Sequence, residues 1–232
     1  MVILVVAMAG FILLHLLVSG TRLRGVLTGM ISEGAYMGLF SLTSAAFLAW
    51  FIFAFGQARS DPGNAVFWTA TSATRWIQAA IQLIAIPLAV VGLTTPNPTS
   101  VAQTGVLEKA DAIRGVLRIT RHPFLWGVSL WAVGHILVNG NLAAFVLFGG
   151  LLLLAQLGTR SIDAKRERAL GDAWTTFAVQ TSNTPFAAIA AGRQSLKLGE
   201  IGVIRLAAGV AVWAAVMMFH AMAFGVPATP WV

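Results

Sequence analysis

The chain has no cysteine and few charged residues. Its 232 residues include 15 lysines and arginines and 8 acidic residues, so only 10% of the chain is charged. Without cysteine, the chain has no disulfides, thiolate metal sites, haem attached through Cys-x-x-Cys-His, or cysteine nucleophiles. Soluble domains carry about a quarter charged residues, and disordered chains have low hydrophobicity. The composition therefore excludes both of these classes.

The chain has long apolar runs instead. Hydrophobic residues make up 58% of it, and they gather in runs near the length of about 20 residues that a membrane-spanning helix needs. The sequence predicts an all-α, polytopic transmembrane helical bundle that forms a single integral membrane domain over residues 1–232. About six spans are expected, at Val2–Val18, Tyr36–Phe55, Trp76–Leu93, Pro123–Val138, Leu142–Leu157 and Ile201–Phe224.

The basic residues are distributed unevenly among the connections. Arg59 and Arg75 lie on one side of the predicted membrane. The other side has twelve basic residues, namely Arg22, Arg24, Lys109, Arg114, Arg118, Arg121, Arg160, Lys165, Arg166, Arg168, Arg193 and Lys197. The positive-inside rule places the richer side in the cytoplasm and both termini outside it. The net charge of +7 is thus interpreted as a signal for orientation in the membrane. Because the excess charge is explained in this way, no nucleic acid partner is expected.

Two connections have predicted local structure. Asn139-Gly140-Asn141 is too short for anything but a tight turn, which makes the fourth and fifth spans an antiparallel hairpin. In the longest polar connection, apolar residues recur at helical spacing among charged ones, at Val106, Leu107, Ala110, Ile113 and Leu117. This pattern predicts a basic amphipathic helix in the cytoplasmic interface.

Three histidines lie inside predicted spans: His15, His135 and His220. Polar side chains within a membrane face the bundle interior and mark functional sites. A neutral imidazole binds metals, and two facing imidazoles can hold a haem iron, whereas an interhelical hydrogen bond is the structural alternative. The helical rise puts His135 and His220 about 21 and 22 Å from the cytoplasmic end, but His15 only about 10 Å from it. Depth alone therefore pairs His135 with His220.

Arg121-His122-Pro123 begins the predicted fourth span. Proline suits a first helical turn, and the free N–H groups of that turn attract anions. With Arg121 and His122 adding positive charge, a carboxylate, a phosphate or a haem propionate is expected to bind there. The alternative is a basic anchor at the lipid headgroups.

The third span contains a polar stripe. Arg75, Gln78 and Gln82 recur at i, i+3 and i+7, so they are expected to point inward together. We interpret the stripe as a structural hydrogen-bond network.

Taken together, these residues resemble the signature of the NnrU family. The matching residues are Arg121-His122-Pro123, Gly127, Trp131, His135 and Asn139-Gly140-Asn141, with His15 in the first span. The likeness runs over almost the whole chain. NnrU proteins are membrane proteins associated with denitrification and nitric oxide metabolism. The family includes the 15-cis-zeta-carotene isomerases, which carry a b-type haem and isomerise a carotenoid double bond.

The resemblance implies a site. By motif, the two histidines implicated as haem ligands in those isomerases fall on His15 and His135, with His220 left as an alternative metal ligand. Arg121 and His122 would then steady a haem propionate. Besides membrane lipid, the implied partners are haem and either nitric oxide or a carotenoid-like polyene, in a bacterial inner membrane. The hypothesis is redox-gated ligation, in which a histidine leaves the iron and opens a position for the partner.

A more distant likeness is to isoprenylcysteine carboxyl methyltransferases and phospholipid methyltransferases. They also have Arg-His-Pro-x-x-x-Gly at the start of a helix, where it helps to bind S-adenosylmethionine. Glu167, Leu170, Trp174 and Phe177 echo their following helix. However, Arg166 stands where the first of two paired glutamates is usual. An S-adenosylmethionine-dependent methyltransferase is therefore one alternative, and a non-catalytic assembly factor for nitrite or nitric oxide reductases is another.

Overall fold

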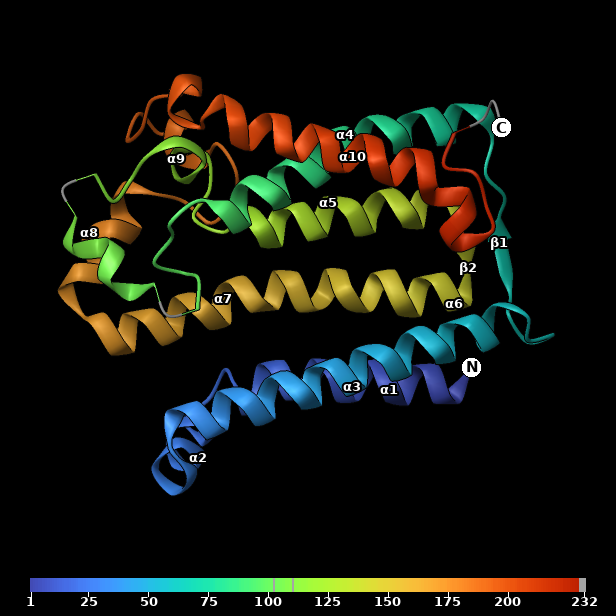
Figure 1. Ribbon diagram of the computed structural model, residues 1–232, viewed down its shortest axis with the longest axis horizontal. Coiled ribbons are helices and arrows are strands. Elements are labelled where there is room, and N and C mark those ends of the chain that lie inside the picture. The colour runs from blue at the N-terminus through green and yellow to red at the C-terminus, as the bar shows by residue number, and fades with distance from the viewer. Residues whose placement is uncertain (102, 110, 230–232) are drawn as a thin grey trace.

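Residues 1–101, 103–109 and 111–229 are described by the computed structural model. Long helices run side by side, and a short pair of strands lies at one end (Figure 1). The elements are α1 (Val2–Leu13), η1 (Leu14–Val18), α2 (Leu23–Ile31), α3 (Glu33–Arg59), β1 (Val66–Trp68), α4 (Ser72–Thr94), η2 (Thr104–Glu108), η3 (Gly115–Arg118), α5 (Pro123–Val138), β2 (Gly140–Asn141), α6 (Leu142–Ala144), η4 (Phe145–Gly149), α7 (Gly150–Leu170), α8 (Asp172–Gln180), α9 (Ala187–Ala190), η5 (Leu198–Glu200) and α10 (Val203–Phe224).

The all-α transmembrane bundle is confirmed, because helices run through all six predicted spans. Among the described residues, α3, α4, the stretch Leu142–Leu170 and α10 are each long and apolar enough to cross a membrane. α5 is apolar but has only 16 residues. The first predicted span, α1 with η1, is followed by α2 at a bend of 80°. Six crossings and the side on which the termini lie stay predictions.

α7 runs through the middle of the bundle in Figure 1, between α1 and α3 on one side and α4, α5 and α10 on the other. The contacts agree: α4 packs against α5 and α10, α5 packs against α7, and α1 packs against α3 and α7. The N-terminus and the last turn of α10 lie at the end of the bundle that holds β1 and β2, whereas α2, α8 and α9 lie at the opposite end (Figure 1). We call that opposite end the basic end, since Arg24, Arg168 and their basic neighbours are there.

Small residues allow helices to approach closely around α4. A Cβ on Gly127 of α5 would lie 2.7 Å from the backbone nitrogen of Ala89, and one on Gly209 of α10 would lie 2.6 Å from Cα of Pro87. Such contacts are typical of membrane bundles, where small residues let backbones pack. The position of α5 is therefore fixed by α4.

The hairpin prediction is confirmed, and the turn does more than reverse the chain. Its Gly140 and Asn141 form β2, which pairs antiparallel with β1. The Asn141 side chain also caps the next helix by accepting a hydrogen bond from the Ala144 nitrogen at 3.0 Å, and Asn64 accepts one from the Ala143 nitrogen at 2.9 Å. The sequence analysis did not predict the pairing of β1 with β2.

The predicted amphipathic helix over Val106–Leu117 is wrong. The structure has only the short 3-10 helices η2 and η3 there, with non-helical residues between them, and Ala110 lies outside the described residues. Arg114 is extended and Gly115 has a positive φ of 56°. The Gly115 nitrogen donates to the Glu200 carboxylate at 2.9 Å, so a tertiary contact overrides the local helical pattern.

Candidate functional site

His15 lies in an irregular part of the first span. It belongs to η1, a π-helical turn, which adds one residue to the helix and often occurs at functional sites. Its Nδ1 lies 2.8 Å from the carbonyl oxygen of Phe11. The Phe11 and Phe40 rings lie 4.4 and 5.2 Å from the imidazole, between centroids.

His135 has the same local arrangement on α5. Its Nδ1 lies 2.8 Å from the carbonyl oxygen of Trp131. The Trp131 ring lies 4.5 Å from the imidazole, and Phe148 stacks on the imidazole at 4.7 Å with an interplanar angle of 25°. Phe148 belongs to η4, a second π-helical turn.

These hydrogen bonds define the tautomer of both histidines. A carbonyl oxygen only accepts, so Nδ1 must be the donor, and in the neutral imidazole the lone pair is then on Nε2. Metal-bound histidines use this state, with the second nitrogen donating to a carbonyl or carboxylate. The Nδ1 of His220 is likewise 2.7 Å from the carbonyl oxygen of Val226. Tautomer alone therefore does not separate the three histidines.

One hydrophobic core adjoins both His15 and His135. We call these two residues with Phe11, Phe40, Trp131 and Phe148 the histidine–aromatic cluster. Phe11, Trp131 and Phe148 pack in one hydrophobic core formed by α1, α3, α5, α6 and η4. η4 contacts both α1 and α5, so Phe148 lies in the element that bridges the two histidine-bearing helices.

The structure does not bring His15 and His135 into direct contact. Among the described residues, their rings contact aromatic neighbours and not each other. His220 lies close enough to His135 for electrostatic interaction. α10, which carries His220, packs mainly on α4.

Of the predicted polar stripe, Gln78 and Gln82 are buried, whereas Arg75 is only half-buried. The Gln82 Nε2 donates to Gln78 Oε1 at 3.1 Å and to the carbonyl oxygen of Trp131 at 3.3 Å. The same carbonyl accepts from His135 Nδ1, so Gln82 and His135 share one acceptor. These amides also fill the space beside Gly134, the residue before His135. A Cβ on Gly134 would lie 2.0 Å from Gln78 Oε1.

Arg121 and His122 share a carboxylate at the basic end. Arg121 donates to Asp163 through Nε, at 3.1 and 3.0 Å from the two oxygens, and through Nη2 at 2.5 Å. His122 Nε2 donates to Asp163 Oδ1 at 2.7 Å. The His122 side chain is only 1% exposed, and its Nδ1 is buried without a hydrogen-bond partner. The anion next to these two residues is therefore a side chain of α7.

Asp163 is not among the site residues that the sequence predicts. The signal was present, because Asp163 is one of only eight acidic residues and closely follows the apolar run of the fifth span. Further hydrogen bonds surround the pair: the Arg121 carbonyl oxygen accepts from Asn97 Nδ2 at 3.0 Å and Thr99 Oγ1 at 3.1 Å. This network ties the start of α5 to α7 and to the segment after α4.

A second ion pair joins η3 to η5 at the basic end. Arg118 donates to Glu200 through Nε at 2.7 Å and through Nη2 at 3.1 Å. The Arg118 hydrogen bonds, with the Gly115 N–H, lower the pKa of the Glu200 carboxyl to about 2. Glu200 is thus a carboxylate at any physiological pH.

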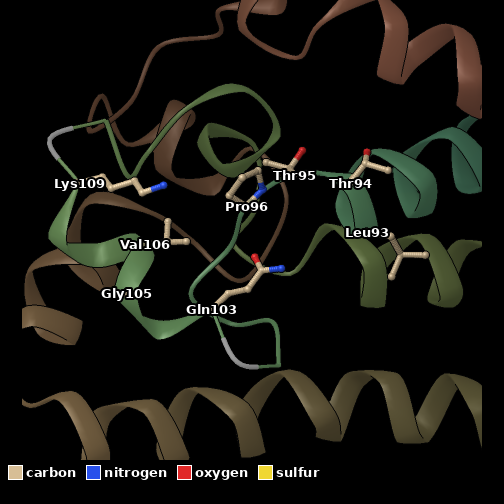
Figure 2. Close-up of a pocket in the computed structure, with 8 residues that line it drawn as sticks. All are labelled: Leu93, Thr94, Thr95, Pro96, Gln103, Gly105, Val106 and Lys109. Carbon is tan, nitrogen blue, oxygen red and sulfur yellow. The ribbon is translucent and has the colours of Figure 1, made fainter.

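The pocket in Figure 2 lies at the basic end, outside the histidine–aromatic cluster. It has a volume of about 340 Å³ and lies between the end of α4 and η2. The residues that line it are Leu93, Thr94, Thr95, Pro96, Gln103, Gly105, Val106 and Lys109. None of the predicted site residues is among them. Over residues 1–101, 103–109 and 111–229, no three His, Asp or Glu side chains gather into a metal-binding group.

Comparisons with known proteins give a family and partial relatives. The chain is 38% identical over 82 residues to the chloroplastic 15-cis-zeta-carotene isomerase of Zea mays, and 37% identical over 82 residues to that of Arabidopsis thaliana. Each match covers 35% of this chain and 22% of the relative, so the chain spans about a fifth of the curated relatives that it matches. No solved structure matches the chain. The profile of the NnrU protein family matches residues 3–228, and the chain therefore belongs to the NnrU protein family.

Proposed function

We propose that this membrane protein binds a b-type haem through His15 and His135 and isomerises a polyene double bond. The observation that carries the proposal is the pair of π-helical turns. η1 contains His15, and η4 supplies the Phe148 ring that stacks on His135. Because such turns are frequent at functional sites, their coincidence with these two histidines favours His15 over His220.

The Nε2 atoms of His15 and His135 are suitable ligands for a haem iron. A haem brings four nitrogen ligands of its own, so the protein has to supply only axial ligands. His15 and His135 both hold Nδ1–H on a carbonyl oxygen four residues earlier, which leaves the Nε2 lone pair for a metal. A bound haem would supply a redox-active iron that accepts small ligands.

The chain's own residues have two roles in the proposed site. The carbonyl hydrogen bonds orient each imidazole, and Gln82 shares the carbonyl that holds His135. The rings of Phe11, Trp131 and Phe148 exclude water around the imidazoles and give an apolar surface to a hydrocarbon substrate. Cis–trans isomerisation needs no atom from solvent, so a dry, aromatic site suits it.

The partial identity with 15-cis-zeta-carotene isomerases supports isomerisation over a role in nitric oxide metabolism. Arg121 and His122 bind Asp163, which weighs against the S-adenosylmethionine site of the methyltransferase alternative. We further propose that the protein lies in a bacterial inner membrane, and the distribution of basic residues supports a cytoplasmic location of the basic end.

Absorption spectra test the haem. Protein from haem-replete cells, purified in detergent, should show a Soret band that His15→Ala and His135→Ala shift or abolish. His220→Ala is the matched control and should leave the band unchanged. Absence of a band, or a band unaffected by both substitutions, would contradict haem binding. A band altered by His220→Ala and not by His15→Ala would assign the second ligand to α10.

Substrate conversion tests the reaction class. The purified protein, with haem reduced or oxidised, is incubated with 15-cis-zeta-carotene, and the isomers are separated chromatographically. We expect conversion that His135→Ala abolishes. Calorimetry with S-adenosylmethionine should give no binding heat. If the protein shows a haem spectrum but does not convert the substrate, haem binding is supported and the isomerase assignment is wrong.

A further inference from the structure

Basic side chains gather where the chain turns from η1 into α2. Gly20, just after η1, lies so close to α7 that a Cβ on it would be 2.4 Å from Ser161 Oγ. One turn further along α7, Lys165 lies within electrostatic range of Arg24, Arg166 and Arg168. Arg166 is also within that range of Arg24, so α2 and α7 bring their cations together.

Negative charge does not balance this cluster. Glu33 is paired with Arg24 and is the acidic group within electrostatic range of Lys165. Asp163 on the same helix is already shared by Arg121 and His122. Among the described residues, Lys165 and Arg166 form no ion pair with a carboxylate. Partly buried cations that repel one another are costly unless an anion accompanies them.

Two buried hydrogen-bond donors are left without partners at the same place. Tyr36 is only 4% exposed, and its hydroxyl has no hydrogen-bond partner. The Arg24 guanidinium lies over the Tyr36 ring, 5.4 Å from its centroid. Arg166 donates through Nη2 to the Ser100 carbonyl oxygen at 2.6 Å, but its Nε is buried and unpartnered. Buried donors are normally satisfied, which points to a ligand with acceptor oxygens.

The position of α2 indicates where this ligand comes from. The 80° bend turns α2 across the end of the bundle, and its side chains Leu23, Val26 and Met30 are 43%, 59% and 74% exposed. A short helix with an exposed apolar face and adjoining cations is typical of the boundary between headgroups and acyl chains. The neighbouring α3 also exposes Leu39 and Leu42, which offers acyl chains an apolar surface beside the cations.

We propose that Arg24, Lys165, Arg166 and the Tyr36 hydroxyl form a binding site for the phosphate of an anionic phospholipid. Arginine and lysine donors bind phosphate oxygens through charge-assisted hydrogen bonds. The lipid's acyl chains lie against α2 and α3. The site is separate from the proposed haem ligands and does not depend on the haem.

Native mass spectrometry of the full chain in detergent tests the site with phosphatidylglycerol as the probe. We expect one phosphatidylglycerol adduct to survive activation that strips phosphatidylcholine. In the double variant Lys165→Gln, Arg166→Gln, retention of that adduct should fall about tenfold. The matched control Lys109→Gln, Arg160→Gln removes the same charge from exposed positions at the basic end and should retain the adduct.

A milder variant guards against misfolding of the double variant. Tyr36→Phe keeps the ring under Arg24 and removes only the hydroxyl, and it should lower retention about threefold. Equal retention of phosphatidylglycerol and phosphatidylcholine, or equal loss in the control, would overturn the proposal. Displacement of the lipid by millimolar inorganic phosphate would assign the site to free phosphate. If the double variant retains the lipid adduct but contains less haem, these cations bind a haem carboxylate instead of a lipid phosphate.

Discussion

The ion pairs of the basic end and the histidine–aromatic cluster differ in how their polar side chains are satisfied. At the basic end, Arg121, His122 and Asp163 satisfy one another, as do Arg118 and Glu200. In the histidine–aromatic cluster, His15 and His135 each hold Nδ1 on a backbone carbonyl oxygen. Within the described residues, no hydrogen bond uses their Nε2 lone pairs, whereas the side chains of Arg121 and His122 are paired with Asp163.

This contrast separates stability from function. Substitutions in the saturated networks should lower the free energy of unfolding without changing the histidine–aromatic cluster. Substitutions around His135 should change both. Substitutions of decreasing expected effect, from Asp163→Ala to Glu200→Gln, distinguish the two roles.

Asp163→Ala should be the most destabilising of these substitutions. Removing one partner of a buried ion pair typically costs about 3–5 kcal/mol, and here Arg121 and His122 lose the carboxylate that they share. Tryptophan fluorescence during denaturant titration in mixed micelles measures the loss. Glu167→Ala on the exposed side of the same helix is the control and should change stability by at most about 0.5 kcal/mol. If the two substitutions lower stability equally, the ion pairs of Asp163 do not stabilise the fold.

Gly134→Ala should act on stability and on His135 together. The added Cβ would meet Gln78 Oε1 at 2.0 Å and Gln82 Nε2 at 2.7 Å, and overpacking of this kind costs about 1–3 kcal/mol. Displacement of Gln82 also frees the carbonyl that it shares with His135. Unfolding titrations and the absorption spectrum of the haem-loaded protein are the two measurements.

Gly38→Ala is the control for that substitution. A Cβ on Gly38 in α3 has no heavy atom within 4 Å, so alanine should stabilise the helix by up to about 1 kcal/mol. A Gly134→Ala protein with lowered stability and an unchanged spectrum would show that Gln82 does not position His135.

Asn141→Ala should have a smaller effect, confined to the hairpin. The Asn141 side chain caps α6 through the Ala144 nitrogen, and loss of such a cap costs about 1 kcal/mol. Asn141→Ser keeps an N-cap oxygen and should recover most of the stability in the same unfolding titration. If serine fails to restore stability, the hydrogen bond that the Asn141 side chain accepts from Asn64 Nδ2 matters more than the cap.

The Glu200 ion pair should have the smallest effect, visible through its pH dependence. Because the folded-state pKa is lowered from 4.5 to about 2, the stabilisation is present above about pH 4.5 and is lost as the pH falls towards 2. A partly exposed pair contributes up to about 1 kcal/mol. The difference in stability between wild type and Glu200→Gln should therefore be constant from pH 5 to 7 and shrink below pH 4.5. A difference that grows at low pH would contradict the pairing.

Most of the fold could be predicted from the sequence because apolar length and helical structure are coupled in a membrane. The runs around Val2–Val18 and Pro123–Val138 became helices at the predicted places. The connection with Gly115 was predicted incorrectly, because its conformation depends on Glu200, which is 85 residues away. The strand pairing of Val66 with Asn141 escaped prediction for the same reason.

The candidate site was less predictable than the fold. The sequence indicated which histidines lie in spans, but their tautomers depend on carbonyl hydrogen bonds that only the structure gives. The positive charge at Arg121 and His122 predicted a bound anion, and the anion that the structure places there is the side chain of Asp163. Sequence spacing gave no way to decide between an internal carboxylate and a ligand, because Asp163 is 42 residues from Arg121.

The π-helical turn at Leu14–Val18 also makes the length of the first helix critical. Deleting one residue from this turn would restore regular α-helical register and rotate the preceding part of α1 by about 100°. Met8, whose side chain lies against Gly150, and Gly10, which faces Phe47, would then leave their partners together. The number of residues between Met8 and Gly20, which contacts Ser161 after the turn, is therefore set by side-chain fit on both sides of the turn, and not by the thickness of the bilayer.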